Sequence, residues 1–154
     1  MSKFVGIYNK YGTILILLFL VAIVSIISPN FLDLNNIMNI LQQVSVNGLI
    51  ALGMTFVILT AGIDLSVGSI LALSGMALGM MILSGVNEVL AIIIVLVLGA
   101  VLGFVNGTFI SKVKLEPFIV TLATMTMFRG ITLVISDGIP AMGVTTDAPI
   151  LDFL

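Results

Sequence analysis

Long apolar runs separated by short polar breaks make up most of this chain. A helix rises about 1.5 Å per residue and the hydrocarbon core of a bilayer is about 30 Å thick, so about 20 apolar residues can cross it. The pattern therefore predicts an all-α membrane protein, with a single transmembrane domain over residues 1–154 and about five transmembrane helices. The expected spans are about 11–32, 37–62, 65–84, 89–111 and 117–136.

The first apolar run is expected to be an uncleaved span. It is too long for the core of a signal peptide, and no small-residue cleavage site lies near its end. The run ends at Ser28-Pro29-Asn30, because proline disfavours a helical conformation in the residue before it.

The lysines predict the orientation. Lys3 and Lys10 precede the first span, and Lys112 and Lys114 lie between the fourth and fifth spans. Because cytoplasmic loops carry an excess of Lys and Arg, we expect both pairs and the N-terminus to be cytoplasmic.

A row of amides runs along the first half of the second span. On a helix, Asn36, Asn39, Gln43 and Asn47 fall within a sector of roughly 80°. Unsatisfied polar groups cost several kcal/mol in hydrocarbon, so this row does not face lipid. Three interpretations stay open: an interfacial segment outside the bilayer, a span whose outer half lines an aqueous path, or amide bonding between helices.

Asp64 is the only acidic residue in the long apolar region between Leu34 and Asn87. One interpretation is a helix cap: Gly62 ends the second span, and Asp64 starts the third by accepting amide hydrogens. The other places the turn below the membrane surface, as a break whose exposed helix ends coordinate a solute or act as a hinge. Asp64 and its neighbour Ser66 are therefore candidates for the translocation path or its gate, together with Asn39, Gln43 and Asn47.

Glycines recur at spacings of three and four in the third and fourth spans. Small residues at such spacings allow the backbones of two membrane helices to approach closely. We expect a helix-packing role, with a ligand approaching the bare backbone as the alternative. The residues concerned are Gly68, Gly75, Gly79, Gly99, Gly103 and Gly107.

Arg129 is the one charge inside the fifth span. Its side chain either extends outward to the interface, pairs with another group, or takes part in a transport path. The following segment Asp137-Gly138-Ile139-Pro140 predicts a turn, and residues 141–154 contain too many breaks for another span.

Composition supports the membrane interpretation and excludes several chemistries. The chain is 60% hydrophobic and only 8% charged, whereas soluble domains carry about a quarter charged residues. Its net charge of −2 and lack of a basic cluster argue against nucleic acid. With no Cys and no His, it offers no thiol nucleophile, no histidine base and no typical transition-metal site. We expect no catalytic residue and no metal site.

Several motifs resemble the ribose-type permeases of ATP-binding-cassette (ABC) importers. The most specific run is Gly62-Ile63-Asp64-Leu65-Ser66-Val67-Gly68-Ser69. Others are Ser28-Pro29-Asn30-Phe31, Asn39-Ile40-Leu41-Gln42-Gln43 and Pro117-Phe118-Ile119-Val120-Thr121-Leu122. Ribose permeases are the most similar members of a class that also imports xylose, arabinose, galactosides and autoinducer-2.

The resemblance implies a permease subunit in a bacterial inner membrane that imports ribose or a similar monosaccharide. The implied partners are a second permease copy, a cytoplasmic ABC ATPase and a periplasmic sugar-binding protein. The chain itself would need no cofactor, because ATP is used by the partner ATPase.

The chain resembles only the N-terminal half of such permeases, which are about twice as long. We therefore expect a truncated permease that does not transport alone. The alternatives are a small helical membrane protein acting as scaffold or inhibitor, or a permease for another small solute such as autoinducer-2 or an amino acid.

Overall fold

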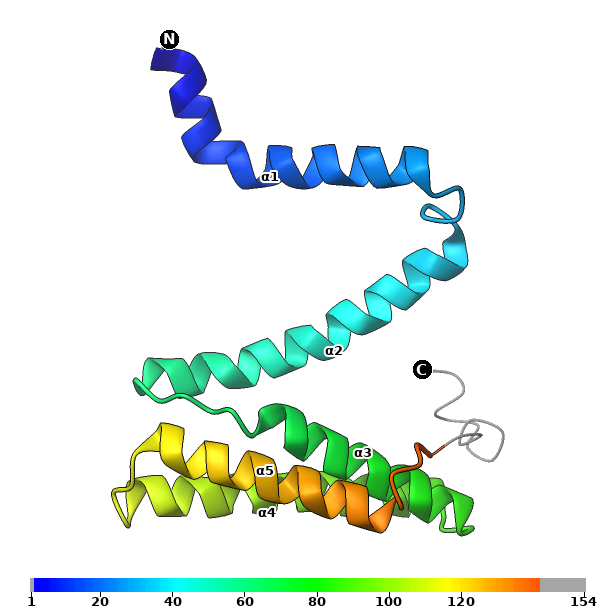
Figure 1. The fold of residues 1–154 in the computed structure, drawn as a ribbon, viewed down its shortest axis with the longest axis vertical. Helices are drawn as coiled ribbons and strands as arrows, with labels where there is room; N and C mark the ends of the chain where they lie inside the picture. The colour runs from blue at the N-terminus through cyan, green and yellow to red at the C-terminus, as the bar shows by residue number, and fades with distance from the viewer. Residues whose placement is uncertain (1, 142–154) are drawn as a thin grey trace. The chain divides into compact units, whose positions relative to one another are not determined.

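The computed structural model describes residues 2–141, and within that range the chain forms five α-helices and no strand (Figure 1). The predicted all-α class is confirmed. Residues 142–154, where no further span was expected, lie outside the described residues. The helices are α1 (Ser2–Ile27), α2 (Leu34–Leu59), α3 (Val67–Leu83), α4 (Glu88–Ser111) and α5 (Pro117–Ile135).

The helix ends follow local chemistry. Pro117 occupies the first turn of α5, where its missing N–H costs nothing. Asn87 caps α4, because its side chain accepts from the backbone N–H groups of Val89 and Leu90 at 3.1 and 3.3 Å. Asp137 and Gly138 follow α5 with φ of 50° and 72°, which confirms the predicted turn.

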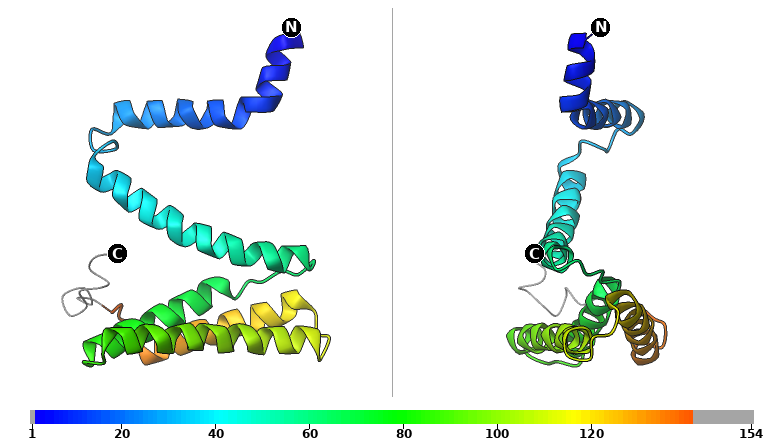
Figure 2. Two further views of the ribbon diagram at one scale, coloured as in Figure 1. Left: turned by 180° about the vertical axis from the view of Figure 1, so that it is seen from behind. Right: turned by 90° about the vertical axis from the view of Figure 1, so that its left-hand side faces the viewer.

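The chain divides into two compact units, residues 1–51 and 52–154. The first holds α1 and the beginning of α2. The second holds the end of α2, the α2–α3 linker, and a bundle in which α3 packs against both α4 and α5 and α4 also contacts α5. Figures 1 and 2 show these three helices side by side.

Burial in the second unit is the reverse of that in a water-soluble domain. Large apolar side chains face outward: Leu96 is 68% exposed, Phe104 70% and Val134 76%. The buried set includes four polar residues, Ser66, Ser69, Asn106 and Thr121. An apolar exterior around polar side chains fits a hydrocarbon solvent, in which polar groups must find partners inside the protein.

Three of the described helices are long and apolar enough to cross a membrane: α2, α4 and α5. The apolar part of α1, Tyr11–Ile27, and the whole of α3 are shorter apolar helices. The arrangement of five spans in one membrane domain stays a prediction.

The glycines expected to pack helices together are mostly open in this structure. A Cβ added at Gly68, Gly75, Gly103 or Gly107 would meet nothing within 4 Å. At Gly99 it would lie 3.7 Å from the Ser74 hydroxyl, and Gly79 is buried. The packing role stays a prediction.

Candidate functional site

The break between α2 and α3 is built from two consecutive turns. The first ends α2: the N–H of Ala61 donates to the carbonyl of Ile58 at 2.9 Å, and that of Gly62 to Val57 at 3.0 Å. These are the bonds of a Schellman motif, whose turning residue lies in the left-handed region. That residue is Ala61, with φ of 56°, and not the expected Gly62.

The second turn is closed by Asp64. Its Oδ1 accepts from the backbone N–H of Ser66 at 2.7 Å and from the Ser66 hydroxyl at 2.6 Å. Helix α3 begins only at Val67, two residues later than the predicted start of the third span, and no side chain caps it. The prediction that Asp64 caps the first turn of α3 is therefore wrong, because its carboxylate is used inside the preceding turn.

Two side chains, one from α4 and one from α5, donate hydrogen bonds to the break between α2 and α3. Asn106 on α4 donates from Nδ2 to the Ser66 hydroxyl at 2.8 Å. Thr121 on α5 donates its one hydroxyl proton mainly to the Pro117 carbonyl of its own helix at 2.8 Å, and the Ile63 carbonyl of the break is a longer partner at 3.3 Å. Both side chains are buried, so the backbone around Asp64 is held by α4 and α5 as well as by its own turns.

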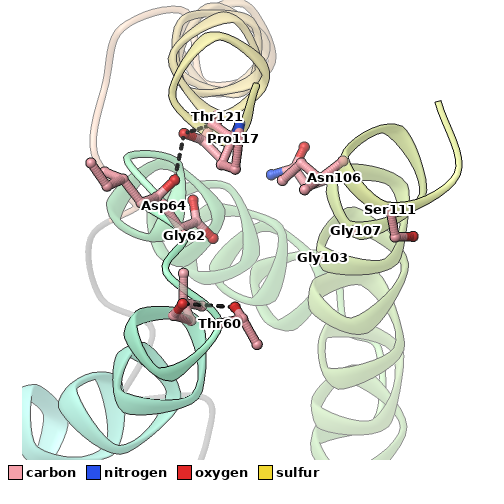
Figure 3. Close-up of a pocket in the computed structure, with 12 residues that line it drawn as sticks. Thr60, Gly62, Asp64, Gly103, Asn106, Gly107, Ser111, Pro117 and Thr121 are labelled. Atoms are coloured by element: carbon pink, nitrogen blue, oxygen red, sulfur yellow. Dashed lines mark hydrogen bonds between the residues drawn. The ribbon is translucent and has the colours of Figure 1, made fainter. Parts of the chain in front are cut away.

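A cavity of about 400 Å³ lies beside the break. Figure 3 shows Asn106 and Thr121 pointing toward the break that contains Asp64. The twelve lining residues include one carboxylate, one amide and three hydroxyl side chains, and no Lys or Arg. They are Val57, Thr60, Gly62, Ile63, Asp64, Gly103, Asn106, Gly107, Ile110, Ser111, Pro117 and Thr121.

Asn106 has unused hydrogen-bonding capacity at this cavity. Its Nδ2 is bonded to Ser66, but its Oδ1 is buried and has no partner among the described residues. Buried acceptors nearly always have a donor, so this oxygen is an exception among the described residues.

The structure brings Asp64 and Ser66 together with two of the predicted packing glycines, Gly103 and Gly107. Gly68 instead lines a second cavity of about 390 Å³ between α3 and α5, together with Arg129. The role of each residue stays a prediction.

The amide row lies in the first unit. Asn39 lines an open polar hollow of about 500 Å³ at the start of α2, whereas Gln43 and Asn47 are exposed farther along the helix. The other residues of the hollow are Ser28, Asn30, Phe31, Asp33, Asn35 and Asn36.

Sequence reasoning missed Asn106 and Thr121. A signal for Asn106 was available, because it is the only amide in the expected span 89–111. Thr121 carried no such signal, since threonine is common in membrane helices and readily bonds its own backbone.

Comparison with known proteins identifies the family. The family described as branched-chain amino acid transport system / permease component matches residues 36–150. The ribose import permease protein RbsC of Bacillus subtilis is 60% identical over 94% of this chain. The D-allose transport system permease protein AlsC of Escherichia coli is 51% identical over 91%.

A third relative, the autoinducer 2 import system permease protein LsrD of E. coli O157:H7, is 39% identical over 87% of this chain. The chain spans 45%, 44% and 42% of the lengths of these three relatives, as expected for the N-terminal half of such a permease. No solved structure matches it. With its apolar helices and these relatives, the chain is a multi-pass membrane protein that belongs to the family of transport permease components named above.

Proposed function

We propose that this chain forms part of the transmembrane permease of an ABC importer for ribose or a similar monosaccharide. The observation that carries the proposal is the 60% identity to the B. subtilis ribose import permease over nearly the whole chain. The apolar exterior and the polar break at Asp64 fit a subunit that moves a polar solute through lipid.

The chain would provide part of the path for the solute and would catalyse no reaction. We assign Asn39, Gln43 and Asn47 to the outer part of the path, and Asp64 with Ser66 to its gate. ATP would be hydrolysed by a cytoplasmic ABC ATPase, so no cofactor is needed here. A second permease copy and a periplasmic sugar-binding protein complete the proposed assembly in the bacterial inner membrane, with the N-terminus cytoplasmic.

A chimera tests this function. The aligned segment of the B. subtilis ribose permease is replaced by residues of this chain, and uptake of labelled D-ribose is measured in cells that lack their own permease. We expect ATP-dependent uptake from the chimera and none from the 154 residues alone. A chimera that reaches the membrane in normal amounts but imports no ribose would overturn the proposal.

A second candidate is import of another small solute. It is favoured by the 39% identity to the autoinducer 2 permease and by the description of the matching family. Competition of labelled ribose uptake by unlabelled D-allose, autoinducer-2 and leucine separates these substrates. If neither the chimera nor the chain imports any of them, the scaffold or inhibitory role is favoured.

A further inference from the structure

Arg129 is a charged side chain in an apolar part of the molecule. Helix α5 is long and apolar enough to cross a membrane, and Arg129 is the only ionisable residue in it. Its side chain is exposed and forms no hydrogen bond or ion pair with any residue that the structure describes. Charged groups in membrane helices are costly and almost always pair with another group. Arg129 therefore indicates a binding partner of opposite charge.

The depth of Arg129 in the helix limits what this partner is. Arg129 lies six residues before Ile135, the last residue of α5, and twelve after Pro117, the first. At about 1.5 Å per residue these separations are about 9 Å and 18 Å. The Cα–Cβ bonds of a helix tilt toward its N-terminus, so the side chain leaves the backbone in the direction away from the nearer helix end. A side chain of another membrane helix reaches this depth more easily than a lipid phosphate at the membrane surface.

The cavity beside Arg129 also lacks an acceptor for its charge. This cavity of about 390 Å³ lies between α3 and α5, and its lining contains no acidic residue. The two hydroxyl groups of the lining, on Ser69 and Thr132, already donate to the backbone carbonyls of Ser66 and Phe128 at 2.7 and 2.8 Å. A guanidinium group offers five N–H donors. The missing group is therefore an acceptor, and a negatively charged one balances the arginine.

The α3 wall of the cavity favours a negative group and leaves room for a helix. Gly68 lies in the first turn of α3, which no side chain caps, so this wall is at the positive end of the helix dipole. A Cβ added at Gly68 would meet nothing within 4 Å, and Ala72, one turn later, is exposed. Small residues one turn apart allow another membrane helix to approach closely.

We propose that the face of α3 and α5 formed by Gly68, Ala72 and Arg129 binds another membrane helix, whose Asp or Glu side chain pairs with Arg129. A carboxylate fits a guanidinium group through two parallel hydrogen bonds. The partner helix would lie against Gly68 and Ala72, where its backbone can come close. This surface requires that α5 crosses the membrane, and it is independent of which solute the chain helps to import.

A synthetic membrane helix provides the probe. One peptide consists of about 23 Leu and Ala residues with a single Glu at its centre, and a second peptide has Gln there. The full chain has no natural cysteine, so a fluorescent donor is attached at Val113→Cys, and each peptide carries an acceptor. Energy transfer is measured in phosphatidylcholine liposomes at pH 8 as the peptide-to-lipid ratio is raised.

We expect the chain to bind the Glu peptide about tenfold more tightly than the Gln peptide. Arg129→Lys should keep part of this preference, because the charge remains, and Arg129→Gln should lose it. Equal binding of the two peptides by the chain with Arg129 overturns the proposed surface.

Moving the charge separates the cavity from charge alone. Met127 is 61% exposed on the same helix and lies outside the lining, so the double variant Met127→Arg/Arg129→Gln keeps the charge but removes it from the cavity. This variant should bind both peptides equally. A retained preference for the Glu peptide would show that an arginine anywhere on α5 suffices, which overturns the site.

Filling the cavity tests the helix contact. Gly68→Leu should weaken binding of both peptides about tenfold. Gly130→Leu is the matched control, because Gly130 is equally open but lies outside the lining, and it should leave binding within about twofold. Circular dichroism verifies that both variants are helical. Equal binding by the two variants overturns the contact at Gly68.

Two other occupants of this face give different results. If a second copy of the chain binds there, donor-labelled and acceptor-labelled copies transfer energy without peptide, and Arg129→Gln abolishes the transfer. If a lipid phosphate binds there, replacing half of the phosphatidylcholine by phosphatidylglycerol removes the preference for the Glu peptide. Either result overturns the assignment to a helix of another protein.

Discussion

Asn106 and Thr121 reach the Asp64 break from two different helices, and each uses a different kind of bond. Asn106 contacts the Ser66 hydroxyl, whereas Thr121 contacts the Ile63 backbone carbonyl. The first bond holds a side chain of the break at 2.8 Å, and the second, longer contact at 3.3 Å reaches its main chain. A break held at both levels keeps the Asp64 carboxylate in one place, which a binding site or a gate requires.

Asn106→Leu is expected to change the stability of the chain only slightly. The substitution removes one interhelical bond, worth about 0.6 kcal/mol on average in membrane proteins. It also removes a buried acceptor without a donor, which costs about 1–3 kcal/mol. The free energy of unfolding should therefore stay the same or rise by about 1 kcal/mol, measured by SDS titration and circular dichroism in mixed micelles. A fall of more than about 1 kcal/mol, compared with Thr108→Val, would mean that Oδ1 has a partner after all.

Two neighbouring residues in the first turn should respond to substitution with opposite signs. Ala61 is left-handed, which costs a residue with a Cβ about 1–2 kcal/mol, so Ala61→Gly should stabilise the chain by up to about 1 kcal/mol. A Cβ at Gly62 would lie 3.3 Å from both the Val57 carbonyl oxygen and its Cγ1, so Gly62→Ala should destabilise by about 1–3 kcal/mol. Thermal unfolding followed by circular dichroism measures both.

Gly53→Ala is the control for this pair, since a Cβ there meets nothing within 4 Å and the residue lies inside α2. It should be neutral or slightly stabilising. Equal losses from all three substitutions would contradict the Schellman geometry at this break.

At the scale of the helices, much of the fold follows from the apolar pattern. Pro117 correctly marked the start of α5, and Ser28-Pro29-Asn30 correctly marked the end of α1. The α2–α3 break was predicted too short, because the pattern does not show that Ser66 takes up the Asp64 carboxylate. The hydrogen bonds from Asn106 and Thr121 to the break were missed for a related reason. They join residues 40 and 58 positions apart, and spacing along one helix cannot reveal such pairs.

The start of α4 provides a test at this scale. Asn87 accepts from two backbone N–H groups that would otherwise have no partner in the helix. Asn87→Ala should lower the free energy of unfolding by about 1 kcal/mol. Asn87→Ser should retain most of the stability of the natural chain, because serine also caps helices well. Thermal unfolding of the two variants in the same detergent gives the comparison, and equal stability of both would rule out a capping role.

At the scale of the whole chain, lysine placement predicts which loops face the cytoplasm. The natural chain has no cysteine, so single-cysteine variants can be labelled without background. Val113→Cys lies in the lysine-containing loop and Leu32→Cys in the loop between α1 and α2, and both positions are exposed.

We expect a membrane-impermeant maleimide to label Val113→Cys only in inside-out vesicles and Leu32→Cys only in right-side-out vesicles. A variant labelled from both sides after permeabilisation serves as the control for reactivity. Labelling of both positions from the same side would contradict the predicted topology.

The two hydrogen bonds that Asn106 and Thr121 donate to the Asp64 break also have a consequence for biogenesis. Ribosomes add about 5–20 residues per second, so Ile63 and Ser66 are synthesised seconds before their partners Thr121 and Asn106. Until α4 and α5 have entered the membrane, the segment Ile63–Ser66 lacks its hydrogen bonds to Asn106 and Thr121. The most specific motif of the chain is therefore expected to reach its final geometry late during synthesis, and a nascent chain stalled before Asn106 should still be open to protease at Asp64.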